Sequence, residues 1–171
     1  MTWTAPEVER PERPVGDEQT SLAGMLEHQR LTLRSKCGGL TAEQLCRQPI
    51  PGSTLSLLGI VRHLIDAEAV WWRERFAGEE IEFLYFTEEF PEADFEDLVP
   101  ERAEADFAAY DAELARIRET LANRTLDEEF TRASGQTVNV RWLYLHMIAE
   151  YARHNGHADL IREQIDGRTG D

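Results

Sequence analysis

Apolar residues recur at spacings of three and four in four long segments of the chain, and this periodicity constrains the fold more than any other feature. Such spacing lines one face of an α-helix, whereas a half-buried strand alternates apolar and polar residues. No sustained alternation occurs, so we expect helices to build the core. Capping residues, glycines and a proline bound the segments. We predict helices from Asp17 to Gly38, Thr54 to Phe76, Pro100 to Leu121, and Val140 to Ile165.

Four amphipathic helices in 171 residues predict an all-α fold, a single four-helix bundle. The long acidic and aromatic connection after the second helix is expected to cross the bundle. Shorter connections should hold a helical turn beginning at Thr41 and a turn or short hairpin over residues 125–140. Residues 1–16 contain three prolines and are expected to form an extended N-terminal arm, anchored by Trp3, ahead of one domain over residues 17–171.

Charge and composition exclude several classes of function. Asp and Glu outnumber Lys and Arg by 33 to 18, a formal charge of −15, so nucleic-acid binding is not expected. No stretch approaches the roughly 20 apolar residues of a membrane span, and no targeting segment is recognisable, which favours a cytoplasmic protein with no membrane partner. Cys37 and Cys46 form neither a C-x-x-C motif nor a disulfide framework, and we interpret both as reduced and structural.

The segment HMIAEYARHNGH, in the fourth predicted helix, concentrates three of the five histidines and one glutamate. At roughly 100° per residue, His146, Glu150, His154 and His157 fall within about 80° of one another on a helix. Leu143, Leu160 and Ile161 project the same way, so this stripe should lie on a buried face. Buried imidazole and carboxylate groups need a hydrogen-bond partner, an opposite charge or a metal ion.

His63, on the second predicted helix, is the obvious residue to face this stripe. A histidine, a glutamate and a second histidine could form a mononuclear metal site with open coordination positions. Spacing alone leaves open a buried polar seam without metal. Gly156 interrupts a helix at some cost in stability, which favours crowding of the backbone beside the site. The chain has no H-E-x-x-H, no paired E-x-x-H, no nucleotide-binding glycine motif and no G-x-S-x-G elbow.

The sequences STLSLLGIVRHL and HMIAEYARHNGHADLIRE resemble the DinB-like superfamily over most of residues 17–167, in particular the branch related to mycothiol-dependent maleylpyruvate isomerase. The resemblance implies a DinB-like four-helix bundle, often dimeric, with His63, Glu150 and His154 as ligands of a divalent metal. The commoner H-x-x-x-H-R-G-Q pattern differs here, since Glu150 and His157 occupy its outer positions. His146 and His157 are expected to support the ligands or to touch substrate.

The resemblance also implies an activity, for which we carry three hypotheses. The first is a transferase or isomerase in which the metal, zinc first with nickel or iron as alternatives, activates a low-molecular-weight thiol such as mycothiol or bacillithiol toward a small electrophilic substrate. The second is a non-catalytic bundle of the stress response that binds a metal or a small molecule. The third is an interaction protein in which the histidines form only a polar seam. A homodimer is the expected assembly.

Overall fold

The computed structural model describes residues 2–12 and 15–170, so residues 1, 13 and 14 of the predicted arm and residue 171 of the predicted domain lie outside the described residues. Helices dominate the fold, which confirms the predicted all-α class. Its elements are α1 (Glu18–Cys37), α2 (Ala42–Leu45), α3 (Leu57–Glu68), the π-helix η1 (Ala69–Phe76), α4 (Ala93–Glu96), the 3₁₀ helix η2 (Pro100–Arg102), α5 (Ala103–Leu121), β1 (Glu129–Thr131), β2 (Thr137–Asn139) and α6 (Val140–Asp166).

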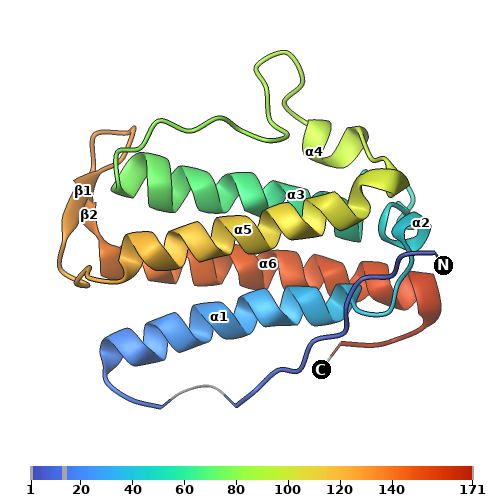
Figure 1. The fold of residues 1–171 in the computed structure, drawn as a ribbon, viewed down its shortest axis with the longest axis horizontal. Helices are drawn as coiled ribbons and strands as arrows, with labels where there is room; N and C mark the ends of the chain where they lie inside the picture. The colour runs from blue at the N-terminus through green and yellow to red at the C-terminus, as the bar shows by residue number, and fades with distance from the viewer. Residues whose placement is uncertain (1, 13–14, 171) are drawn as a thin grey trace.

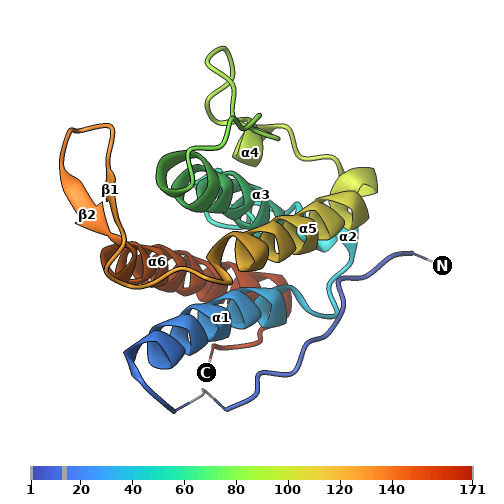
Figure 2. The ribbon, with the colours of Figure 1, turned by 60° about the vertical axis from the view of Figure 1, so that its left-hand side comes forward.

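The long helices lie side by side as a bundle in which α1 and α6 run in one direction and α3 and α5 run in the other (Figure 1). Packing joins α1 to α6, α6 to α3, and α3 to α5. The segment over residues 77–99 leaves the end of η1 and returns along the bundle before α5 begins (Figure 1). We call it the crossover segment, and its path confirms the predicted crossing. The hairpin of β1 and β2 projects at one end of the bundle (Figure 2).

Local capping explains why several helices begin where the sequence predicted. The side chain of Asp17 accepts a hydrogen bond from the backbone of Thr20, and that of Asn139 accepts one from Trp142. The second predicted helix needs correction at both ends. It starts at Leu57 rather than Thr54 because the side chain of Ser56 caps it, and its last eight residues form a π-helix rather than continuing as an α-helix.

The centre of the bundle contains a buried polar network among the apolar side chains of the core. Arg30 donates two hydrogen bonds to the carboxylate of Glu68, of 2.7 and 2.8 Å. The hydroxyl of Tyr151 donates to the same carboxylate and lies 2.8 Å from the hydroxyl of Tyr110. All four residues are buried. A buried ion pair of this kind is tolerated because the partners satisfy each other's charge and hydrogen bonds.

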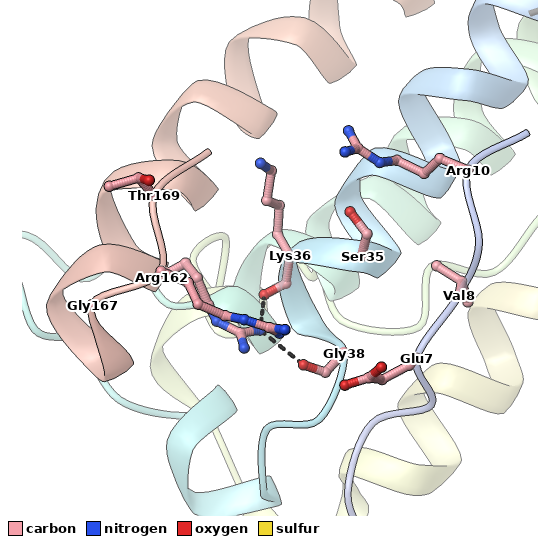
Figure 3. A pocket seen from close by; sticks show the side chains of 10 residues that line it. Glu7, Val8, Arg10, Ser35, Lys36, Gly38, Arg162, Gly167 and Thr169 are labelled. Atoms are coloured by element: carbon pink, nitrogen blue, oxygen red, sulfur yellow. Dashed lines mark hydrogen bonds between the residues drawn. The ribbon is translucent and has the colours of Figure 1, made fainter. Parts of the chain in front are cut away.

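The described N-terminal residues attach to the ends of two helices. Ala5 exchanges backbone hydrogen bonds with Gly39 and Leu40, and the ring of Trp3 packs edge-on against Phe107 at 5.5 Å. A cavity of about 590 Å³ opens where this segment meets the C-terminal ends of α1 and α6 (Figure 3). Arg162 lines this cavity and donates hydrogen bonds to the backbone carbonyl groups of Lys36 and Gly38 (Figure 3). These bonds satisfy carbonyl groups at the C-terminal end of α1.

Two expectations for the fourth helix were wrong. Leu160, predicted on the buried face, is 57% exposed, whereas Leu143 and Ile161 are buried as predicted. Gly156 is also exposed, and a Cβ atom built there would meet no atom within 4 Å. The backbone at Gly156 is therefore not crowded. No helix within residues 2–12 and 15–170 combines the length and apolar character that a membrane span needs.

Candidate metal centre

His63 of α3 faces Glu150 and His154 of α6, where these helices pack together. Oε1 of Glu150 lies 3.2 Å from Nε2 of His154 and 3.9 Å from Nε2 of His63. One potential ligand atom from each residue lies within 4.8 Å of the other two. The structure thus brings together the three residues predicted as metal ligands, and their role as ligands stays a prediction.

The spacing of these atoms can be compared with the geometry of a metal site. Nitrogen and oxygen ligands bind zinc at about 2.0–2.2 Å in tetrahedral sites, which separates the ligand atoms by roughly 3.3–3.6 Å. The three residues are close to this arrangement and need only a small closure of the side chains. Two imidazoles and one carboxylate also match the chemistry of zinc, nickel and ferrous iron. The residues present therefore fit a divalent metal ion.

Asp94 of α4 orients His63 through a hydrogen bond of 3.0 Å between its Oδ2 and Nδ1 of the imidazole. Because a carboxylate can only accept, Nδ1 must donate, and a neutral ring then carries its lone pair on Nε2. Nε2 is the atom that faces Glu150. Burial by itself would lower the pKa of His63, but the hydrogen bond and the charges of Asp94 and Glu150 outweigh it and raise the pKa.

His154 lies deeper than the other two residues. Its side chain is 11% exposed, compared with 19% for Glu150 and 33% for His63. Burial and the neighbouring His63 lower the pKa of His154, although Glu150 opposes them. A lowered pKa keeps the imidazole neutral at pH 7, which is the form that can bind a metal. Exposure rises toward His63, so a small molecule would reach the centre from that side.

The other two histidines of the stripe do not join this group. His146 packs against two aromatic rings, stacked on Trp142 at 5.0 Å and tilted against Trp71 at 4.2 Å. Burial lowers the pKa of His146. The ring of His157 contacts that of His154 edge-on at 5.6 Å. Both residues therefore flank the centre, and a supporting role for them stays a prediction.

A family model for mycothiol S-transferases matches residues 21–167. The chain belongs to the mycothiol S-transferase family. The match runs through all four long helices and confirms the relationship to the DinB-like superfamily that His63 and the fourth-helix motif indicated. A search of curated proteins gave no significant match.

The two cysteines of this mycothiol S-transferase family member lie outside the centre. Cys37 is buried at the end of α1, and Cys46 is half-buried after α2. Burial raises the pKa of Cys37 to about 12 and that of Cys46 to about 11. Neither thiol is therefore a reactive thiolate at neutral pH, in agreement with the structural role inferred from the sequence.

Sequence reasoning missed the contribution of the crossover segment. Asp94 and Phe95 both contact His63, the latter through rings 5.7 Å apart. Asp66 of α3 holds the same segment by accepting backbone hydrogen bonds from Leu84, Tyr85 and Phe86. In the sequence, Asp94 is one of many acidic residues in this segment, and no regular spacing relates it to His63. Its contact with His63 of α3, which only the fold creates, distinguishes it from the others.

Proposed function

We propose that the protein is a metal-dependent transferase that joins the sulfur of mycothiol, or of a related low-molecular-weight thiol, to a small electrophilic molecule. One observation supports this most directly: in a chain that belongs to the mycothiol S-transferase family, His63, Glu150 and His154 converge with their ligand atoms within 4.8 Å of one another. Zinc is the expected metal, with nickel and iron as alternatives.

The charges of the three residues suit thiol chemistry. Two neutral imidazoles and one carboxylate would balance only part of the charge of a divalent ion. The bound ion would supply the remaining positive charge that favours a thiolate over a thiol. Asp94 keeps the Nε2 lone pair of His63 directed at the centre, and the burial of His154 keeps its ring neutral. The protein thus prepares the ligands before any cosubstrate binds.

The sulfur that reacts must come from a cosubstrate, because neither cysteine of the chain lies among the residues of the centre. In the proposed transfer the thiol loses its proton to solvent, and the sulfur lone pair forms a bond to the electrophilic carbon. The leaving group departs with the electron pair of its former bond to carbon. The products are a thioether and the released leaving group, and no oxidant or reductant is required.

The test is turnover of the purified protein with mycothiol and benzyl chloride, corrected for the uncatalysed reaction. Bacillithiol and glutathione serve as comparison thiols. Turnover should need both the thiol and the metal, and Glu150→Gln should reduce it strongly. Glu163→Gln, an exposed position on the same helix, is the matched control and should remain active. Product formed without thiol, or turnover that survives complete metal removal, would contradict the proposal.

A further inference from the structure

We propose that the electrophilic acceptor binds in a cavity between α3 and the crossover segment, and that this acceptor is an apolar molecule without negative charge. The inference rests on the proposed function and adds to it the place and the chemical class of the second substrate. The cavity has a volume of about 260 Å³. That volume suits a small molecule about the size of a substituted benzene ring.

Position is the first argument, because His63 belongs both to this cavity and to the candidate metal centre. The ring of His63 lines the cavity. Its Nε2 faces Glu150 at 3.9 Å, and its Nδ1 binds Asp94, which also lines the cavity. A molecule in the cavity would therefore lie beside the place where the thiol is expected. His63 is also the most exposed of the three residues, so a small molecule would reach the centre from the side on which the cavity lies.

The lining of the cavity is the second argument. Much of its wall is apolar or aromatic, with Ala67 and Val70 on one side and Phe83, Phe86 and Phe95 of the crossover segment on the other. The rings of Phe83 and Phe86 meet edge-on at 5.2 Å. Both rings are more than a third exposed, so an apolar ligand would cover surface that water now contacts. An aryl or alkyl group fits this wall.

The charge around the cavity is the third argument. The crossover segment contains nine acidic residues and no lysine or arginine. Glu92 and Asp94 line the cavity itself, and Oδ1 of Asp94 is buried without a hydrogen-bond partner among the residues described. A carboxylate that entered with a ligand would add to those of Asp66, Glu92 and Asp94 in the lining, which contains no lysine or arginine to compensate its charge. The cavity should therefore reject anionic acceptors.

The crossover segment is held in place without a ligand, which is the fourth argument. The carboxylate of Asp66 fixes three consecutive backbone N–H groups of the segment at 2.9–3.0 Å. The hydroxyl of Tyr85 donates to Asp106 at 2.9 Å, and the guanidinium of Arg62 lies over the ring of Tyr85. A wall that is already ordered costs little additional entropy when a ligand binds.

The larger cavity at the ends of α1 and α6 does not offer an alternative acceptor site. It contains none of the three residues of the candidate centre. Two of its cations are already engaged. Arg162 donates to the backbone carbonyl groups shown in Figure 3 and also binds Asp166, and Lys36 pairs with Asp159. Its position separates it from the transfer chemistry.

The experiment compares benzyl chloride with its para-carboxylate analogue as acceptors for mycothiol, since the two share a leaving group. In each reaction the thiol proton goes to solvent, sulfur bonds to the benzylic carbon, and chloride leaves with the bonding pair. We expect kcat/KM to be at least about tenfold higher for the uncharged acceptor. Glu92→Lys, at the residue before α4, should reduce the ratio of the two kcat/KM values, whereas Glu96→Lys, at the last residue of α4 and outside the cavity, should leave it unchanged.

Two further variants test the location. Phe86→Ala should lower kcat/KM for benzyl chloride by about tenfold, and Phe90→Ala, the same change at a residue of the crossover segment outside the cavity, should have little effect. Ala67→Leu should fill the cavity and also reduce turnover. All variants should bind metal with the stoichiometry of the original protein. Equal rates for the two acceptors, or equal effects of Phe86→Ala and Phe90→Ala, would overturn the proposal.

A binding measurement separates this proposal from the proposed function. Ligand-detected NMR with unreactive benzyl alcohol and benzoate reports occupancy without turnover. Benzyl alcohol should bind, benzoate should not, and Ala67→Leu should abolish the signal. If no thiol gives turnover but this pattern holds, the transferase proposal fails while the cavity assignment stands. If turnover occurs but benzyl alcohol binds equally well to the Ala67→Leu variant, the cavity assignment fails alone.

Discussion

His63 and Asp94, 31 residues apart in the chain, are joined by a hydrogen bond of 3.0 Å between imidazole Nδ1 and carboxylate Oδ2. This bond connects the crossover segment to the candidate metal centre. Carboxylates that orient metal-binding histidines in this way set the tautomer and raise the basicity of the ligand. The crossover segment therefore contributes to the centre although it supplies none of the three expected ligands.

Substitution of Asp94 should weaken metal binding without unfolding the protein. We expect Asp94→Ala to lower the affinity for zinc by about 10–100-fold, since His63 loses the group that orients it. Asp94→Asn should have a smaller effect, because its amide oxygen can still accept from Nδ1. Competition with a chromogenic chelator measures both affinities, and Asp97→Asn is the control. Equal affinity in Asp94→Ala and the original protein would show that the bond is not needed.

The protein should bind about one divalent ion per chain when purified without a chelator or a histidine tag. Elemental analysis checks this stoichiometry. His63→Ala and His154→Ala should each abolish stoichiometric binding because each removes a ligand. His146→Ala and His157→Ala should lower the affinity by no more than about 10–100-fold. If the unmodified protein folds well but takes up no zinc, nickel or iron, the metal-site prediction is wrong, and the hypothesis of a buried polar seam without metal is favoured.

The two cysteines should react slowly with iodoacetamide in the folded protein. Burial raises the pKa of Cys46 to about 11, so at pH 7 only about one molecule in 10⁴ carries the thiolate. Because the pKa of Cys46 is raised, the rate of its alkylation should increase about tenfold for each pH unit and become constant only near pH 11. Mass spectrometry follows the modification, with urea-unfolded protein as the fast reference. Cys37→Ser and Cys46→Ser should retain thiol transfer.

Removing one partner of the buried Arg30–Glu68 pair should destabilise the bundle. Arg30→Met leaves the carboxylate of Glu68 buried without its cation, which should cost about 3–5 kcal/mol in the free energy of unfolding. Arg141→Met, which breaks an exposed pair with Glu18, should have little effect. Urea denaturation compares the two variants. A loss for Arg30→Met no larger than that for Arg141→Met would contradict this account of the core.

The sequence alone predicted the helices well because the signals that start and stop a helix are local. The caps at Asp17 and Asn139 bind backbone groups three residues away, so the chain itself contains both partners. The one-turn separation of Glu150 and His154 is local in the same sense. The relationship to the DinB-like superfamily was also visible in these motifs, and the family match over residues 21–167 confirms it.

Tertiary structure decided which members of the histidine stripe meet His63. His146 and His154 are separated by roughly 12 Å along a helix axis, at about 1.5 Å per residue, so one ion cannot reach both. The position along α6 at which His63 of α3 packs places it beside Glu150 and His154. His146 instead contacts Trp71 and Trp142. Asp94 and the acceptor cavity depend likewise on where the crossover segment lies on α3. Such contacts join residues distant in sequence, and helical periodicity carries no information about them.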